Sequence, residues 1–448
     1  MDQSWLTLLD ARVPRYTSYP TAPHFHPRIG SSTFETWLEA IDPQQPISLY
    51  VHVPFCHQLC WYCGCNTHIV KGERPVELFL KNVLKEIGLV ERHLTGRPKV
   101  SHLHFGGGSP NRLTGGQFDQ IMARLHQTFE FIEGAEIALE IDPRHLDADQ
   151  VRTYARWGVN RASLGVQDFD AQVQKAMNRI QPFDTVARAV GLLRAAGISA
   201  INFDLLYGLP LQSIDTIHAT IAQTVLLSPD RVALFGYAHV PWLKKQQKTL
   251  ERSGLPAPLQ RAGLALYARA ELEKHYEPIG IDHFAKAGDS LAVAARNRQL
   301  HRNFQGYTVD AAQTLIAFGP SGISATPQGF AQKEPELAAW NQCIEAGQLG
   351  IRRGIALQPA DRLRSAIIEQ IMCHLDVDVE TLAQEHGETP EQFLPCFDRL
   401  AAFAAQGLVA IEGWQLKIPA ERRLAARSVA SAFDAYLQPE ETRHSAAI

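Results

Sequence analysis

The sequence predicts an α/β protein: a parallel sheet rolled partly or completely into a (β/α) barrel, with an N-terminal arm and a mainly helical C-terminal domain. Short β-branched and apolar runs recur between residues 48 and 284. Amphipathic stretches with apolar residues at helical spacing separate these runs. Six or seven such alternating units are typical of a parallel sheet covered by helices.

The predicted strands follow one another along the chain. They are residues 48–55, 100–105, 136–142, 161–167, 200–208, 231–240 and, less regular than the others, 278–284. The clearest helical patterns lie at 76–94 and 185–197. Gly197 ends the second helix, because glycine readily adopts the backbone conformation that closes a helix.

We expect four parts in the chain. A Pro- and Tyr-rich extended arm covers residues 1–40, the barrel core covers 41–290, and a loop-rich segment that contacts the ligands covers 291–355. Residues 356–448 form a helical domain, in which a hairpin pattern at 407–418 resembles a winged-helix module. The net charge is −4, so we expect this module to pack against the barrel and not to bind nucleic acid.

Composition and cysteine usage indicate a cytoplasmic protein. Of 448 residues, 45% are hydrophobic and 20% are charged, which is ordinary for a soluble globular chain. The N-terminus lacks the apolar region of a secretory signal, and no apolar run approaches 18 residues, so no membrane partner is expected. Seven cysteines are an odd number, and Cys343, Cys373 and Cys396 are scattered, which argues against a disulfide framework.

The other four cysteines form a dense motif, with Cys56, Cys60, Cys63 and Cys65 spaced C-x3-C-x2-C-x-C. Clustered thiolates suit an iron–sulfur cluster or zinc. A structural zinc site normally needs two well-separated ligand pairs, and no second cysteine pair follows here. Three thiolates on a four-iron cluster would leave one iron open for a ligand. An iron–sulfur cluster is therefore favoured, with zinc or a redox dithiol as the alternatives.

Polar and glycine-rich residues gather where the predicted strands end. In a parallel sheet these carboxyl ends share one edge, where active sites form. The residues are the cysteine loop, the sequence GGGSP at 106–110, Glu140, Gln167, Asp204 and the sequence YAHVP at 237–241. One rim therefore carries the predicted site.

The segment YVHVPFCHQLCWYCGCN, residues 50–66, resembles the signature of the radical S-adenosylmethionine (SAM) superfamily. Within it, the chain is similar to the oxygen-independent coproporphyrinogen III oxidase family. Further matching motifs, in order, are PRYTSYPTA, HFGGGSP, EIDPR, LGVQDF, DLLYGLP, YAHVP, GIDHFA and HRNFQGYT. Small departures are Ser109, where threonine is commoner, and Gly322, where alanine is expected.

The resemblance implies that Cys56, Cys60 and Cys63 hold a 4Fe–4S cluster, while Cys65 is not a ligand. The family binds two SAM molecules. Positions matching the first SAM site are Tyr50, Gly107 and Glu140. Positions matching the second are Tyr62, Gly108, Ser109, Gln167, Arg179, Asp204 and Ala238. Phe304, Gln305 and Ile323 match positions that border the reaction centre, with Ile323 also contacting SAM.

The implied reaction removes a β-hydrogen from each of two propionates of coproporphyrinogen III with a 5′-deoxyadenosyl radical. Carbon dioxide leaves and vinyl groups remain, giving protoporphyrinogen IX for haem biosynthesis. An electron donor such as a flavodoxin or ferredoxin is required, and a monomer is expected. Because arginine binds carboxylates well, Arg15, Arg302 and Arg353 are candidates for holding the propionates.

Two other functions compete with this one. A haem chaperone of the same superfamily keeps the three-cysteine loop but lacks the fourth cysteine, the PRYTSYP arm and the HRNFQGY segment, all of which are present here. A zinc-stapled interaction protein would instead bind zinc and contain no iron or sulfide. Both remain alternatives at the level of sequence.

Overall fold

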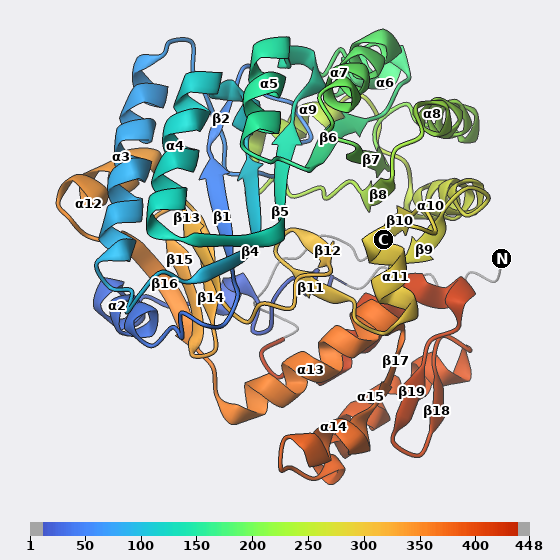
Figure 1. Ribbon diagram of the computed structural model, residues 1–448. Helices are drawn as coiled ribbons and strands as arrows, with labels where there is room; N and C mark the ends of the chain where they lie inside the picture. Colours follow the sequence, from blue (N-terminus) through green and yellow to red (C-terminus); the bar gives the residue numbers. More distant parts are fainter. Residues whose placement is uncertain (1–11, 438–448) are drawn as a thin grey trace.

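The computed structural model describes residues 12–437, and its largest element is a twelve-stranded sheet (Figure 1). Residues 1–11 of the predicted arm and residues 438–448 of the predicted C-terminal domain lie outside the described residues. The strand order is β16-β15-β14-β13-β1-β4-β5-β6-β7-β8-β10-β9. Within the described part of the chain this sheet has two edges, so the barrel is partial. The predicted α/β class is confirmed.

Seven neighbouring strands of the sheet are parallel. They are β13 (Leu315–Phe318), β1 (Ile47–Val53), β4 (Lys99–Gly107), β5 (Glu130–Ile141), β6 (Arg161–Gln167), β7 (Ala200–Tyr207) and β8 (Arg231–Gly236). Antiparallel strands flank them: β14 (Ile323–Thr326), β15 (Gly329–Lys333) and β16 (Ile351–Ala356) on one side, β10 (His283–Ala285) and β9 (Glu277–Ile279) on the other.

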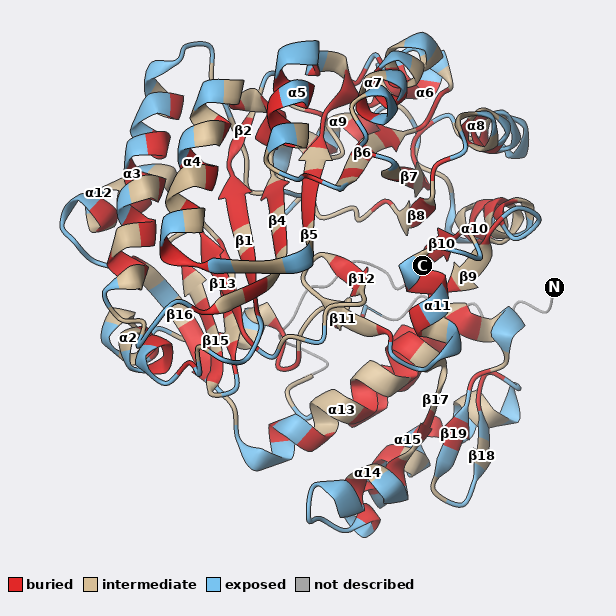
Figure 2. Ribbon diagram, viewed as in Figure 1, coloured by how far each residue is buried: buried red, intermediate tan, exposed pale blue. Residues whose placement is uncertain are grey.

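Helices cover the outer face of the sheet, and their inward sides are buried (Figure 2). They are α3 (Arg74–Glu91), α4 (Gly115–Thr128), α5 (Ala148–Arg156), α6 (Ala171–Ala176), α7 (Phe183–Ala195), α8 (Ile214–Leu227) and α10 (Pro258–Leu272). The predicted helices at 76–94 and 185–197 correspond to α3 and α7. In α3, Val76, Phe79 and Val83 recur at helical spacing and are fully buried, which explains why this stretch folds as a helix on the sheet.

Two segments differ from the prediction. Residues 278–284, expected as one strand, form the two short antiparallel strands β9 and β10, because Gly280 has φ +53° and turns the chain there. Residues 291–355, expected to be rich in loops, contain α12 (Leu337–Glu345), the hairpin β11 (His301–Asn303) and β12 (Gly306–Thr308), and β13 to β16. These strands have three to six residues, too few for a clear alternating pattern.

The C-terminal region is mainly helical, as predicted. It consists of α13 (Pro359–His374), α14 (Val379–Glu385), α15 (Leu394–Ala405), α16 (Ala426–Ala430) and a small sheet of β17 (Asp376–Asp378), β19 (Gln415–Lys417) and β18 (Ala410–Glu412). The hairpin expected at 407–418 is β18–β19. The domain boundaries at residues 40, 290 and 355 stay predictions. No helix within residues 12–437 is long and apolar enough to cross a membrane.

Candidate active site

The cysteine loop lies at the carboxyl edge of the parallel strands, directly after β1. Cys56 ends the short strand β2 (Phe55–Cys56), which pairs with β3 (His68–Ile69) and so closes the loop between them. The loop forms one wall of a cavity of about 280 Å³. Predicted site residues that line this cavity are Cys56, Cys60, Tyr62, Cys63, Gly107, Gly108, Ser109, Glu140, Gln167, Arg179 and Asp204.

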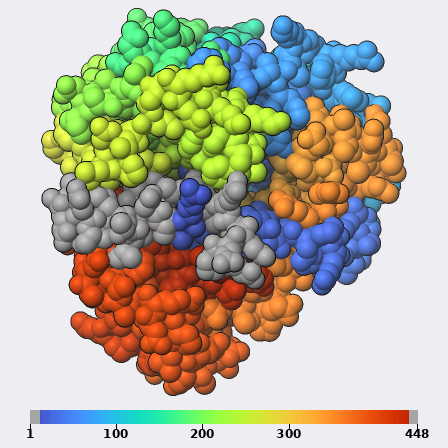
Figure 3. Space-filling view, turned by 180° about the vertical axis from the view of Figure 1, so that it is seen from behind, coloured from blue at the N-terminus to red at the C-terminus, as the bar shows by residue number. Residues whose placement is uncertain are grey.

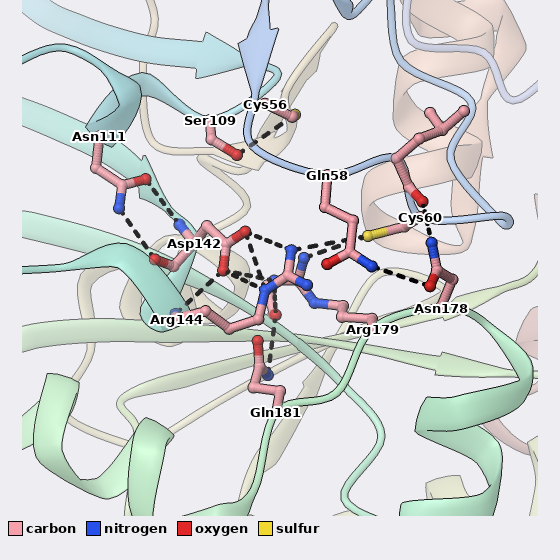
Figure 4. A network of polar contacts seen from close by, with 12 residues as sticks. Cys56, Gln58, Cys60, Ser109, Asn111, Asp142, Arg144, Asn178, Arg179 and Gln181 are labelled. Atoms are coloured by element: carbon pink, nitrogen blue, oxygen red, sulfur yellow. Dashed lines mark hydrogen bonds and ion pairs between the residues drawn. The ribbon is translucent and has the colours of Figure 1, made fainter. Parts of the chain in front are cut away.

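Hydrogen-bond donors surround two of the predicted cluster ligands (Figure 4). The Cys56 Sγ accepts a hydrogen bond from Thr67 Oγ1 at 3.1 Å and lies 3.5 Å from Ser109 Oγ. The buried Cys60 Sγ lies 3.6 Å from Arg179 Nη1. Hydroxyl donors and a guanidinium both stabilise a thiolate, which is the form that binds iron.

The third predicted ligand, Cys63, shares a hydrogen bond with Cys65. This hydrogen bond lowers the pKa of Cys63 to about 7, although burial acts in the opposite direction, and Lys244 lowers it further. Burial raises the pKa of Cys56. The thiol of Cys65 therefore supports the thiolate of Cys63, a contact that gives the fourth cysteine a place beside the ligands.

The three predicted cluster ligands share one cavity. Among the described residues, no group of three or more His, Cys, Asp or Glu side chains is close enough together to hold one metal ion. Cys56, Cys60 and Cys63 nevertheless face the same cavity. A four-iron cube holds its thiolates farther apart than one ion does, so three thiols around a shared cavity suit it.

Arg179 connects the cysteine loop to the ends of β5 and β6. It is buried, donates a hydrogen bond to the Gly165 carbonyl at 2.6 Å, and lies 3.5 Å from Asp142 Oδ1. Burial disfavours the cation, but Tyr62, Asp142 and Cys60 together raise the pKa of Arg179. The side chain is therefore a fixed positive charge next to the thiols, and not the solvated helix charge that its local sequence would favour.

Sequence reasoning missed the roles of Asp142 and Arg144, which complete this charged network (Figure 4). Arg144 Nη2 lies 2.6 Å from Asp142 Oδ2 and 3.9 Å from Cys60 Sγ. Burial would raise the pKa of Asp142, but Arg179 and Arg144 hold it well below its usual range. The signal was present in the motif EIDPR, where Asp142 ends a predicted strand and Arg144 comes two residues later.

The glycine run at the end of β4 lets the backbone come close to its neighbours. Gly107 has φ +118°, and a Cβ there would lie 2.8 Å from the ring of His52. At Gly108 a Cβ would lie 2.6 Å from the carbonyl oxygen of Phe55. A side chain at either position would push the run away from the cysteine loop.

Glu140 faces the cavity from β5. Its Oε2 accepts a hydrogen bond from the Gly107 N–H at 3.1 Å, and its Oε1 lies 3.2 Å from His104 Nε2. Tyr50, on β1, stacks on His104, and its pKa is raised well above the usual value by burial and then by Glu140. The structure thus brings Tyr50 and Glu140 together, as predicted, although Tyr50 does not line the cysteine cavity itself.

Gln167 and Asp204 lie on adjacent strands of the same wall. The pairing of β6 with β7 shifts between Gly165 and Gln167, and Gln167 has φ +69°, a left-handed conformation that is strained for glutamine. Asp204 accepts hydrogen bonds from Ser163 Oγ at 3.0 Å and Asn202 Nδ2 at 2.9 Å. Burial, followed by the charge of Glu140, raises the pKa of Asp204 to about 6.

A second cavity, of about 210 Å³, adjoins the first and extends into the partial barrel. The two share Glu140, Ser163, Asp204 and Phe235 as lining residues. Gln305, from the β11–β12 turn, lines the second cavity. The predicted site is therefore an elongated space with carboxylates at its middle.

Five predicted residues do not line the cysteine cavity: Tyr50 and Gln305, described above, and Ala238, Phe304 and Ile323. Ala238 is half-buried after β8, and Ile323 begins β14. Phe304 lies in a third cavity of about 600 Å³, with its ring 6.0 Å from that of Phe330. Their predicted roles stay predictions.

The three candidate arginines separate into a pair and an outlier. Arg302 lines the third cavity, stacks on Tyr307 at 4.5 Å, and donates a hydrogen bond to the backbone carbonyl of Arg15 at 3.4 Å. Burial, followed by nearby Arg427, lowers the pKa of Arg15 to about 10. Arg353 instead binds Gln332 Oε1 on β15. Only Arg15 and Arg302 come together.

The chain is similar to known proteins along almost its whole length. The model of the Radical SAM superfamily matches residues 50–223, and that of the HemN C-terminal domain matches residues 357–421. The oxygen-independent coproporphyrinogen III oxidase of Bradyrhizobium diazoefficiens is 46% identical over 440 residues, 98% of each chain. That of Cereibacter sphaeroides is 43% identical, over 97% of this chain and 96% of the relative.

A solved structure supports the fold at full length. It is the coproporphyrinogen III oxidase (HemN) from Escherichia coli, which its authors describe as a radical SAM enzyme. The TM-score is 0.90 at 35% sequence identity, over 95% of this chain and 100% of that chain. The likeness therefore includes the C-terminal region as well as the sheet.

Proposed function

This chain belongs to the oxygen-independent coproporphyrinogen III oxidase family, and from this membership and the rim cavity we infer that it oxidises coproporphyrinogen III without oxygen. It is an oxidoreductase of the radical SAM superfamily. Two propionates of the substrate are decarboxylated to vinyl groups, and the product is protoporphyrinogen IX. The observation that carries the proposal is the single cavity lined by the three predicted ligand thiols, a glycine run and the carboxylates of Glu140 and Asp204.

Radical SAM enzymes use a 4Fe–4S cluster and SAM, and we assign the cluster to Cys56, Cys60 and Cys63. When bound, the reduced cluster supplies the electron that splits SAM and so provides the radical chemistry that abstracts hydrogen from an unactivated carbon. Arg179 favours the thiolate form of Cys60, and the hydroxyls of Thr67 and Ser109 favour that of Cys56.

Two SAM molecules are proposed because the elongated space has two sets of predicted residues. Gly107 and Glu140, with Tyr50 beside them, would hold the first. Gln167, Arg179 and Asp204 would hold the second, and Gln305 would border it from the interior. A carboxylate on each side can accept hydrogen bonds from ribose hydroxyls or an ammonium group.

The substrate carries four carboxylates, and we place some of them at Arg302 in the third cavity. Arg302 is held by two backbone carbonyls of the N-terminal arm, those of Tyr16 and Arg15, so its guanidinium is fixed in position. If this is correct, Arg302→Ala raises the KM for the porphyrinogen much more than that for SAM. Arg353→Ala, which changes an arginine outside this pair, leaves both KM values unchanged.

The remaining assignments concern the setting of the reaction. We propose that the enzyme acts as a monomer. Thiolate ligands and a low-potential electron donor require a reducing compartment, and we place the enzyme in the cytoplasm. The donor is proposed to be a one-electron carrier of the flavodoxin or ferredoxin type.

The decisive experiment is anaerobic turnover of the iron–sulfur-reconstituted protein with coproporphyrinogen III, SAM and dithionite, followed by release of carbon dioxide and by vinyl product. The Cys60→Ser variant should lose activity, while Cys343→Ser, which changes a cysteine on α12 away from the site, should keep it. Haem transfer without substrate-dependent 5′-deoxyadenosine would favour the chaperone alternative. Bound zinc without acid-labile sulfide would favour the interaction protein.

A further inference from the structure

Residues 240–250, VPWLKKQQKTL, form a surface segment that we call the lysine segment. It holds three lysines and no acidic residue, in a chain whose net charge is −4. It follows β8 and ends within α9 (Lys248–Glu251). In the rear view of Figure 3, the yellow-green part of the chain that contains it lies on the open surface, next to the blue N-terminal part.

The lysine segment is joined directly to the cysteine loop. Lys244 Nζ donates to the carbonyl of Cys65 at 2.7 Å, and Gln246 Nε2 donates to the carbonyl of Cys63 at 2.9 Å. Gln247 Nε2 donates to the carbonyl of Tyr62, also at 2.9 Å. Three successive donors thus hold the backbone of the loop that carries the thiols, and the segment forms the outer cover of that loop.

The side of the lysine segment that faces solvent combines positive charge with exposed apolar groups. Lys245 and Lys248 are exposed. Trp242 is 37% exposed and Leu243 69% exposed, whereas Leu250 is fully buried and anchors the segment. Tryptophan and leucine side chains in the open, rimmed by lysines, are typical of a protein–protein contact.

We propose that the lysine segment is the docking surface for an acidic one-electron carrier protein that reduces the cluster. This inference rests on the proposed function, because it requires a cluster at Cys56, Cys60 and Cys63. In the step itself one electron leaves the reduced carrier and enters the oxidised cluster, and no atom is transferred. The carrier is acidic because the segment has three lysines and no acidic residue, and Glu251, which follows it, is paired with His239.

Proximity is the reason for this location. Electron transfer between proteins slows steeply with distance, and the hydrogen bonds of Lys244 and Gln246 end on residues of the loop that binds the cluster. A carrier resting on Trp242 and Leu243 therefore contacts the segment that is hydrogen-bonded to the cysteine loop. The lysines steer it there through long-range attraction that added salt screens.

The test compares two charge-reversal variants with the same change in net charge. Lys245→Glu/Lys248→Glu alters the lysine segment, and Lys81→Glu/Arg92→Glu alters exposed positions on or just after α3. The probe is a purified acidic flavodoxin. Its dissociation constant for the cluster-loaded protein is measured by titration calorimetry at low and at high salt, and reduction of the cluster by flavodoxin hydroquinone is followed in a stopped-flow spectrometer.

We expect the lysine-segment variant to weaken flavodoxin binding about tenfold or more at low salt and to slow reduction by flavodoxin in proportion. Reduction by dithionite and the affinity for SAM should not change. The α3 variant should match the unaltered protein within about twofold. Trp242→Ala/Leu243→Ala should weaken binding at high salt as well, because it removes apolar contact.

Equal flavodoxin affinity in the lysine-segment variant and the unaltered protein would overturn the proposal, as would equal losses in both charge variants. So would a change in self-association of the chain, measured by sedimentation, with no change in flavodoxin binding, since the occupant would then be a second copy. The proposed function fails in a different way: dithionite-reduced protein would then not turn over coproporphyrinogen III at all.

Discussion

Two buried charged clusters in this protein differ in what satisfies them. Away from the cavity, Lys333 Nζ and Glu86 Oε1 are 2.8 Å apart and both side chains are 0% exposed. Glu86 also accepts hydrogen bonds from the Gly319 N–H at 2.7 Å and from Trp340 Nε1 at 3.4 Å, and Lys333 donates to the Leu349 carbonyl. Both buried charges therefore have protein partners: they pair with each other and make hydrogen bonds with neighbouring groups.

At the rim, Asp204 and Glu140 accept protein hydrogen bonds but also line cavities. Asp204 accepts hydrogen bonds from the uncharged Ser163 and Asn202, and the neighbouring charge that raises its pKa most is another carboxylate, Glu140. Both acids face the space between the two cavities. We infer from this difference that the Lys333–Glu86 pair serves the fold, whereas Asp204 and Glu140 have room beside them for a ligand.

The largest expected effect is on the buried Lys333–Glu86 pair, whose partners are protein groups. Lys333→Met should lower the free energy of unfolding by about 3–5 kcal/mol, because Glu86 would remain as an unpaired buried charge. Urea denaturation measures this. Lys333→Met/Glu86→Gln removes both charges and should recover most of the loss. If Lys333→Met were as stable as the unaltered protein, Glu86 would not depend on Lys333 as its partner, and the prediction would be wrong.

The next largest expected effect is on ligand binding at Asp204, which lines the cavities. Asp204→Asn should weaken SAM binding by about tenfold or more, since a charge-assisted hydrogen bond contributes roughly 1.5–3 kcal/mol. Stability without ligand should not fall, because an unfavourable buried charge is removed. Equilibrium dialysis of SAM and thermal unfolding report the two quantities.

The matched control for Asp204 is Asp168, a second buried aspartate whose pKa burial raises to about 6. Its oxygens accept hydrogen bonds from Gln212 Nε2 at 2.6 Å and Thr220 Oγ1 at 3.0 Å, and it lines none of the cavities described above. Asp168→Asn should therefore change stability and leave SAM affinity unaltered. If both variants lost SAM binding, lining a cavity would not distinguish a ligand-binding aspartate from a structural one.

These two clusters also show how far the sequence could lead. Cys60, Glu140 and Asp204 could be predicted because each follows or lies within a strand with a readable pattern. The pairing of Lys333 with Glu86 could not, since the two residues lie on β15 and α3, far apart in the chain. The same holds for Lys244, whose contact with Cys65 spans 179 positions and leaves no local signal.

The fold shows the same limit. The order of β1, β4, β5, β6, β7 and β8 follows from alternating units in the sequence. The position of β13 does not: it adds to the sheet in front of β1 although it is encoded more than two hundred residues later. The four residues of β13 are too few to show a hydrophobic periodicity that would distinguish a strand from a loop. Topology of this kind is decided by tertiary packing.

A smaller effect is expected from pH. The pKa of Asp204 is raised from its usual 3.8 to about 6, so the folded, unliganded protein binds the proton more tightly than the unfolded chain. This contribution destabilises the folded state as pH rises from about 4 through 6. A ligand that needs the carboxylate should bind about fourfold more weakly at pH 5.5 than well above pH 6. SAM titrations at both pH values test this, and Asp204→Asn should show no such step.

The smallest effect concerns a third kind of charged contact, at the surface. Arg298 binds Asp376 through two hydrogen bonds, of 3.1 and 2.6 Å, but the side chains are 54% and 36% exposed. Water and salt already stabilise these charges, so Arg298→Ala should lower the free energy of unfolding by no more than about 1 kcal/mol. Urea denaturation at low and at high salt should show the difference shrinking as salt is added. A loss in the free energy of unfolding as large as that of Lys333→Met would show that side-chain exposure does not distinguish surface charge pairs from buried structural ones.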